Sequence, residues 1–456
     1  MNQTTSRQRK MAYFVGMLVL LAPIIGLGMP GSGTSGGGAL ARMRSSYDLG
    51  ESNLGQVDPT SATMNLVLLG LRGIAVNILR MDLDYYKDHK EWSKMRTTTE
   101  SVILLQPHYI EVWRFLSWNL AYNVSAEWDA VPERFYWVKE GGKFAQRGTQ
   151  RNQENAELYW DVGKTWSQKV GRSDEWRYFR KYFVKDPDEK SFKGQADPEV
   201  NPEMKDNYLV ARDWYANANE KELGRGQHVM MRALFRSGPY KALLDYADAL
   251  QRDVKYEPSS DVIKEKFSRA RSIFDEGYAE WVSKYGKERY RTGKAEVFME
   301  ADQNDVAALA KENGLDAGVI RREIDFFQKT TNYRYWRERA RAEKMPTTAE
   351  AHRQLYEGER LYKSGKLSKD PTTGKPGAQE MLEEGMANYA KLLDDFVELR
   401  SEDLTVEEGM WGLLIWRKAL DLQGKPIPEN YPLKWLWEEH QGLVASLQDR
   451  FNSMGY

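Results

Sequence analysis

The stretch QPHYIEVWRFLSWNL, residues 106–120, is echoed further along the chain by NQENAELYWDVGKTW, residues 152–166. The two stretches align at an offset of 46 residues, so that acidic, apolar and aromatic residues of one fall on similar residues of the other. In both, bulky residues recur at the three- and four-residue spacing of one helix face. A small residue follows them and lets a neighbouring helix approach closely. The sequence therefore predicts two equivalent helices of a repeated, all-α structure.

The aligned motifs are Trp113-x2-Leu116-Ser117-x2-Leu120 and Tyr159-x2-Val162-Gly163-x2-Trp166. This pattern resembles the first helix of the tetratricopeptide (TPR) repeat, W-x2-L-G-x2-Y. Residues 385–396 resemble the second helix of that family, and a weaker first-helix match begins at Trp411. The family's usual period is 34 residues, so a spacing of 46 implies an insertion of about 12. The resemblance covers about half the chain and is greatest to bacterial membrane-anchored proteins with degenerate repeats.

The resemblance implies a TPR-like α-solenoid of antiparallel helix pairs and assigns roles to two sets of residues. The repeat-packing set is Trp113, Leu116, Ser117, Leu120, Tyr159, Val162, Gly163 and Trp166. In family members that bind peptides, other positions of the first helix line the concave surface. The matching candidates for partner binding are Arg114, Trp118, Tyr122, Trp160, Lys164 and Gln168. Exposed tryptophan beside arginine or lysine suits recognition of an extended peptide, and ordinary packing between repeats is the alternative.

The N-terminus carries an apolar run, Met11 to Gly28, behind the basic residues of segment 1–10. As a helix this run would span roughly 27 Å, close to the thickness of a bilayer core. We therefore predict a single-pass transmembrane anchor at residues 11–29, with a cytoplasmic N-terminus and an extracytoplasmic body. Cleavage of a signal peptide after ALA, residues 39–41, is the main alternative, and a buried core helix is a third. Residues 30–60 are expected to form a flexible, Gly/Ser-rich tether.

The rest of the chain reads as helical. Residues 61–184 hold the N-terminal TPR-like repeats, opened by an amphipathic helix at residues 62–79. A polar linker or insertion follows at residues 185–207, then a middle helical region at 208–345 and a C-terminal TPR-like region at 346–456. No run of alternating β-branched residues bounded by turns stands out, so no strands are expected.

Composition excludes several kinds of chemistry. The chain has no cysteine and five histidines, none with the spacing of a metal site, so no metal is expected. No catalytic motif is found either, and without predicted catalysis no cofactor is expected. Lys plus Arg is 66 against 67 for Asp plus Glu, and acidic residues interrupt the basic–aromatic runs. These runs read as solvated helix faces, with anionic lipid or wall polymer as a minor alternative and no nucleic-acid partner.

Two functions remain open. The first is a scaffold at the bacterial inner membrane, facing the periplasm, that binds another protein and performs no catalysis. The second is a tryptophan-rich helical enzyme or binding protein that acts on envelope polysaccharide, because such enzymes place sugars on aromatic faces and use paired carboxylates. An open superhelix favours the scaffold, whereas a closed toroid with two carboxylates across a pocket favours the enzyme.

Overall fold

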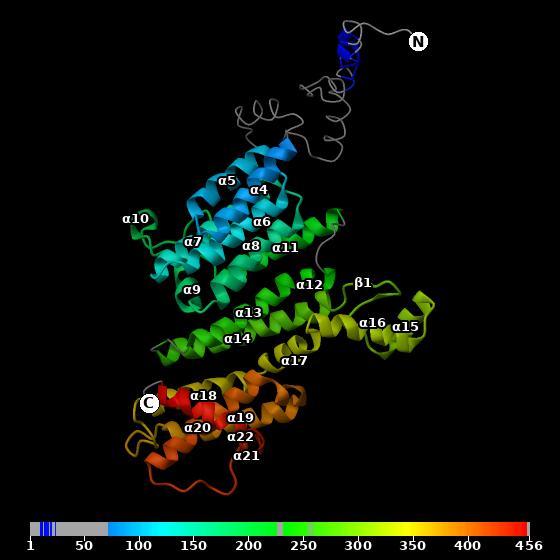
Figure 1. The fold of residues 1–456 in the computed structure, drawn as a ribbon. Coiled ribbons are helices and arrows are strands. Elements are labelled where there is room, and N and C mark those ends of the chain that lie inside the picture. Colours follow the sequence, from blue (N-terminus) through cyan, green and yellow to red (C-terminus); the bar gives the residue numbers. More distant parts are fainter. Residues whose placement is uncertain are drawn as a thin grey trace.

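The computed structural model describes residues 72–225, 231–254, 257 and 259–453, together with residues 10, 11, 13–17, 19, 20 and 23. Within these residues the protein is predominantly helical (Figure 1). Its helices are α4 (Arg72–Asp88), α5 (Trp92–Leu105), α6 (Ile110–Trp118), η2 (Asn119–Val124), α7 (Val131–Arg151), α8 (Ala156–Lys164), η3 (Thr165–Val170), α9 (Trp176–Val184), α10 (Glu189–Phe192), α11 (Asn207–Arg225), α12 (Arg232–Arg236), α13 (Gly238–Asp253), α14 (Ser260–Glu280), η5 (Trp281–Tyr285), α15 (Gln303–Asn313), α16 (Ala317–Thr330), α17 (Tyr333–Glu343), α18 (Pro346–Lys363), α19 (Ala378–Asp395), η6 (Val397–Ser401), α20 (Asp403–Leu422), α21 (Lys434–Glu439) and α22 (Gln441–Ser453).

One small hairpin corrects the expectation of a strand-free chain. Strands β1 (Tyr290–Arg291) and β2 (Glu296–Val297) pair antiparallel, with Tyr290 opposite Val297. Two residues are too short to show the alternation of a half-buried strand, so sequence reading could not find them. Both Tyr290 and Val297 are buried, and they join the hairpin to the hydrophobic core around η5 and α16.

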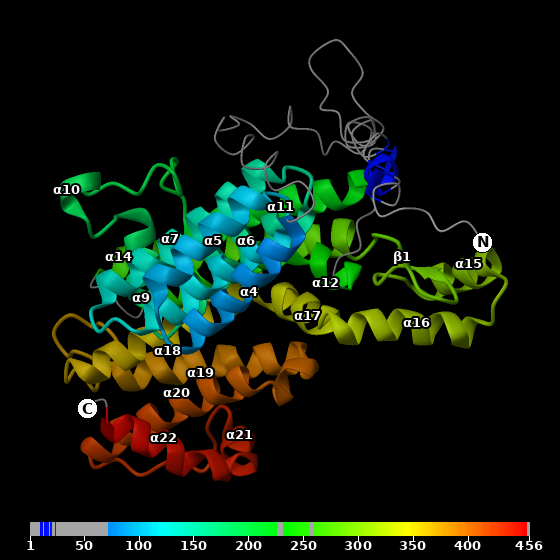
Figure 2. The same cartoon turned by 45° about the horizontal axis from the view of Figure 1, so that its top comes forward.

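Successive helices pack in pairs. The pairs are α4 with α5, α6–η2 with α7, α8–η3 with α11, α13 with α14, and α18 with α19. The second helix of each pair also packs on the first helix of the next: α5 on α6, α7 on α8, α11 on α13, α14 on α18, and α19 on α20. Figures 1 and 2 show these pairs as stacked layers, with α4 near one end and α22 at the other. The prediction of an all-α chain of sequential helix pairs is confirmed.

The two aligned sequence stretches adopt the same local structure. Helix α6 and the π-helical segment η2 occupy residues 110–124, and adding the offset of 46 gives residues 156–170, the bounds of α8 and η3. Each copy therefore switches from an α-helix to a π-helix at the equivalent residue. No separate inserted domain accounts for the long spacing, because α6–η2 and the 21-residue α7 with their short connections fill it.

Both small residues of the motif lie at close helix crossings. A Cβ atom on Gly141 of α7 would stand 2.6 Å from the carbonyl oxygen of Ser117, so these backbones nearly touch. A Cβ atom on Gly163 would stand 2.9 Å from the ring of Tyr215 on α11. The repeat-packing residues are buried, except for Tyr159, which is half-buried. In the later pair, Gly385 of α19 crosses α18 closely in the same manner.

Residues 185–207 are packed against α7 and contain the short helix α10. The ammonium group of Lys139 on α7 lies 2.5 Å from a carboxylate oxygen of Asp186 and 3.2 Å from one of Asp197. Lys143, one turn further along α7, contacts Asp197 at 2.7 Å. The Lys139, Asp186 and Asp197 side chains are 6%, 3% and 4% exposed, so this ion-pair cluster is buried. The polar composition of the segment therefore supplies internal contacts to α7.

The predicted anchor at residues 11–29 lies mostly outside the described residues, and the tether at 30–60 lies wholly outside them. The described residues between 10 and 23 are helical and exposed, among them Met11, Tyr13, Phe14 and Val15. Within the described part of the chain, no helix combines the length and apolar character needed to cross a bilayer.

Candidate functional site

Arg114, a predicted partner-binding residue, is engaged within the fold. Its Nε lies 2.6 Å from a carboxylate oxygen of Asp161, and its Nη1 lies 2.8 Å from Glu157. Both carboxylates belong to α8, so the guanidinium joins the first helices of two successive pairs. Charge-assisted hydrogen bonds from one guanidinium to two carboxylates fix geometry as well as contributing energy. At Arg114 the contacts seen are those between repeats.

Trp160 also points into the fold. Its ring lies 5.6 Å from that of Tyr215 and 6.1 Å from that of Phe235, centre to centre. Lys164, on the same helix, places its ammonium group 5.6 Å from the centre of the Trp160 ring. Trp160 therefore helps to pack α8 against α11 and α12.

Three of the other candidates are exposed, and one is half-buried. Trp118, Lys164 and Gln168 are exposed, and Tyr122 is half-buried. The rings of Trp118 and Tyr122 stack with centres 5.8 Å apart. Segments η2 and η3 contact each other, so the structure brings these four candidates onto neighbouring first helices. They remain a predicted contact surface.

A cavity of about 860 Å³ lies further along the same series of helices. Most of its lining comes from α13, α17, α18 and α20 and from residues 172–176, and α11, α14 and α22 contribute one residue each. Helices α13, α18 and α20 each pack against the second helix of the preceding pair. The cavity therefore lies where first helices of successive pairs face a common space. Volumes of this size suit a ligand or a peptide segment.

Ion pairs between helices fill much of the cavity wall. Arg339 of α17 contacts Asp248 of α13 at 2.7 Å, and Arg172 pairs with Asp245. Arg450 of α22 pairs with Glu407 of α20. The wall is thus charged but largely neutralised internally. Sequence reading missed it because its residues come from helices spread over more than half the described chain.

Aromatic rings in the wall carry cations on their faces. The guanidinium carbon of Arg252 lies 3.7 Å from the centre of the Trp176 ring, and the Lys241 ammonium lies 3.7 Å from that of Trp336. Cation–π contacts at this distance stabilise the positive charge and hold the ring. Trp411 of α20, the third motif match found in the sequence, lines the same cavity. This match was the one sequence signal that pointed towards the cavity.

His352 of α18 links three helices at the cavity wall. Its Nδ1 lies 2.6 Å from a carboxylate oxygen of Glu408 on α20, and its Nε2 lies 3.2 Å from one of Glu343 on α17. Burial disfavours the imidazolium, but Glu408 and Glu343 outweigh burial and raise the pKa of His352 well above its usual value. Burial also opposes ionisation of Glu343, but His352 and Arg339 outweigh burial and lower the pKa of Glu343 to about 2. His352 is therefore charged at neutral pH.

We expect a His352→Gln variant to be destabilised in a pH-dependent way. A histidine with a raised folded-state pKa stabilises the fold fully below its unfolded pKa of about 6.5, and this stabilisation is lost as the pH rises through the folded value. The difference in free energy of unfolding between the two proteins should therefore be largest near pH 6 and shrink in alkaline buffer. Urea titrations across this range measure it. A difference that is constant with pH would show that His352 is not charged in the fold. Tyr389 and the two carboxylates face this ring, Arg339 lies 4.0 Å from Glu343, and all four groups are unchanged in the variant.

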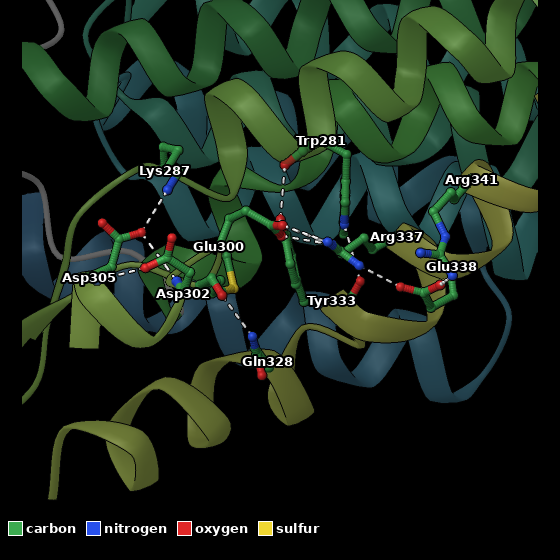
Figure 3. Close-up of polar contacts among 11 residues, drawn as sticks. Trp281, Lys287, Glu300, Asp302, Asp305, Gln328, Tyr333, Arg337, Glu338 and Arg341 are labelled. Carbon is green, nitrogen blue, oxygen red and sulfur yellow. Dashed lines mark hydrogen bonds and ion pairs between the residues drawn. The ribbon is translucent and has the colours of Figure 1, made fainter. Parts of the chain in front are cut away.

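A second polar cluster, drawn in Figure 3, holds α17 from its other side. Glu300 accepts hydrogen bonds from Nε and Nη2 of Arg337 and, at 2.7 Å, from the hydroxyl of Tyr333. Trp281 donates its indole N–H to the carbonyl oxygen of Tyr333 at 3.2 Å. These contacts tie α17 to η5 and to the segment after the hairpin. Other residues of α17, including Trp336, line the cavity.

No protein-family model matches the chain, and no curated protein matches it. The class that the fold defines is an all-α protein whose successive helices pack in pairs. Among the described residues, no group of three or more histidines, aspartates or glutamates is placed to hold a metal ion.

Proposed function

We propose that the protein is a helical-repeat scaffold that binds an extended segment of a partner protein in the cavity between α13, α17, α18 and α20. The observation that carries the proposal is that first helices of successive pairs share this cavity. Stacked helix pairs of this kind use such faces as extended binding surfaces. The partner-binding residues predicted on α6–η2 and α8–η3 lie on earlier members of the same series.

The chemistry of the cavity suits a polypeptide. Leu404 of α20 is 66% exposed and lines it, so an apolar side chain is available for contact. Trp411 and Tyr335 stand in the same lining, and aromatic residues of this type dominate binding energy at protein interfaces. Charged groups surround this apolar surface and would fix the direction of a bound segment.

The proposal places the body outside the cytoplasm, tethered to the bacterial inner membrane by residues 11–29. The support is the apolar run behind a basic N-terminus, and the described residues of that run are helical with exposed apolar side chains. Protease added to spheroplasts should digest the body in this orientation. Full protection from external protease would contradict it.

The rival function, an enzyme acting on envelope polysaccharide, has less support. The rival function predicts a closed toroid, whereas α4 and α22 lie far apart in the stack (Figure 1). Asp245, Asp248 and Glu407 in the cavity wall are each paired with a basic side chain, which leaves them poorly suited to proton transfer with a sugar. Release of reducing ends from purified wall polymer by the protein would favour the rival.

Photo-cross-linking in intact cells tests the scaffold proposal. A benzoylphenylalanine in place of Leu404 should cross-link one protein species, because this side chain lines the cavity. The matched control is Leu422, which is 64% exposed at the far end of the same helix and outside the cavity lining. The proposal predicts a cross-link from position 404 and none from position 422. Equal cross-linking from both, or none from 404, would contradict it.

A further inference from the structure

Arg252 at the end of α13 differs from the other basic residues of the cavity wall. Arg172, Arg339 and Arg450 each pair with a carboxylate. Arg252 has no carboxylate partner among the described residues, although it is half-buried in the wall. Among the described residues, its side chain makes one hydrogen bond, from Nη2 to the carbonyl oxygen of Gly171 at 3.0 Å.

The surroundings of Arg252 hold its charge in place without neutralising it. The face of Trp176 lies against the guanidinium, which fixes the plane of that group. The Nε of Arg252 and the hydroxyl of Ser173 are both enclosed without a hydrogen-bond partner, and both residues line the cavity. These two atoms are closed off from solvent, so an incoming acceptor would reach the Nη groups of Arg252 instead. Carboxylates and phosphates both match the geometry of the guanidinium donors.

The remaining charges of the wall limit what the anion can be. The lining contains six carboxylates against four arginines and one histidine. A phosphate chain or another polyanion would be repelled by this excess, because like charges facing each other across a cavity are unfavourable. A single carboxylate on an otherwise uncharged segment can contact the unpaired guanidinium without bringing further negative charge near the carboxylates of the wall. Exposed Leu404 in the same lining favours apolar neighbours for that carboxylate.

We propose that the Nη groups of Arg252 receive the carboxylate of one acidic side chain on an extended, otherwise uncharged segment of the partner protein. This inference rests on the proposed function and specifies the chemistry of its ligand. The partner class is a peptide with one glutamate or aspartate between apolar residues.

A double-mutant cycle on the full-length protein tests the inference. The probe is a fluorescein-labelled, C-terminally amidated heptapeptide with one central glutamate, a leucine on either side, and serine and glycine at its ends. Its partner probe has glutamine at the centre. By fluorescence anisotropy the wild-type protein should bind the glutamate peptide about tenfold more tightly than the glutamine peptide, the strength of one charge-assisted contact. In Arg252→Gln this preference should vanish.

Two further variants separate this contact from other effects. Arg269→Gln removes an exposed arginine on α14 that lies outside the cavity lining, and it should keep the preference. Arg252→Lys keeps the charge without the fork, and it should keep part of the preference. The inference is overturned if Arg252→Gln retains the preference, if Arg269→Gln loses it, or if the wild-type protein binds neither peptide or both equally. If cross-linking from position 404 persists unchanged in Arg252→Gln, the scaffold function stands, and the contact with Arg252 plays no part in it.

Discussion

Replacement of Trp166 by alanine is expected to lower the free energy of unfolding by about 3–5 kcal/mol. Trp166 is fully buried, and its ring lies 5.3 Å from that of Phe183, centre to centre. A Cβ atom on Gly142 would stand 1.9 Å from the indole, so only glycine at this position of α7 leaves room for the ring. Removal of the ring opens a cavity between η3, α7 and α9 that these helices cannot close without shifting. Urea unfolding followed by far-ultraviolet circular dichroism measures the loss.

Trp118→Ala provides the matched control for this prediction. Trp118 lies in the other copy of the aligned stretch, and its side chain is exposed. Its removal is expected to change the free energy of unfolding by no more than about 0.5 kcal/mol, as for other surface substitutions. Equal losses for the two variants would contradict the separation of packing and surface positions within the repeat.

Lys139→Met is expected to lower the free energy of unfolding by about 3–5 kcal/mol. The methionine fills a similar volume, but it leaves Asp186 buried without its cation, while Lys143 still neutralises Asp197. Removal of one partner of a buried ion pair leaves an uncompensated charge, and this destabilises the fold far more than replacement of both partners by uncharged residues. Thermal and urea unfolding should both show the loss. Limited proteolysis should also cut within residues 185–207, because Lys139 holds that segment to α7.

The double variant Lys139→Met, Asp186→Asn identifies the cause. Removal of both charges abolishes the uncompensated carboxylate and should recover a substantial part of the stability. Lys185→Met is the surface control, since the pair of Lys185 with Glu189 is largely exposed and contributes little. If the double variant were as unstable as Lys139→Met, lost packing would be the cause instead of the buried charge.

The helix pairs could be predicted because their signal is local. Each copy of the large, medium and small pattern lies within one helix, and the small residues Ser117 and Gly163 mark crossings that the structure contains. The π-helical segments η2 and η3 left no such signal, since a shift of hydrogen bonding by one residue depends on the backbone and not on residue type. The hairpin was missed because two-residue strands have no readable period.

The candidate site was harder to predict because its residues meet only in three dimensions. The sequence predicts Arg114 as a contact residue because it cannot show that Asp161 and Glu157 of α8 lie against this side chain. The polar segment at residues 185–207 read as a linker or surface insertion because hydropathy cannot show that a lysine and an aspartate will be buried together. The cavity wall draws on eight helices between α9 and α22, and of these only α20 carried a recognisable motif, through Trp411.

The central claim is that the side formed by α13, α18 and α20 receives the partner. Hydrogen–deuterium exchange of the free protein and of its purified partner complex tests it most directly. We predict that backbone amides slow their exchange around Arg252, His352 and Leu404 when the partner is bound, while α7 and α19 exchange as before. Slowed exchange confined to α7 or α19, or no change at the three cavity segments, would contradict the claim.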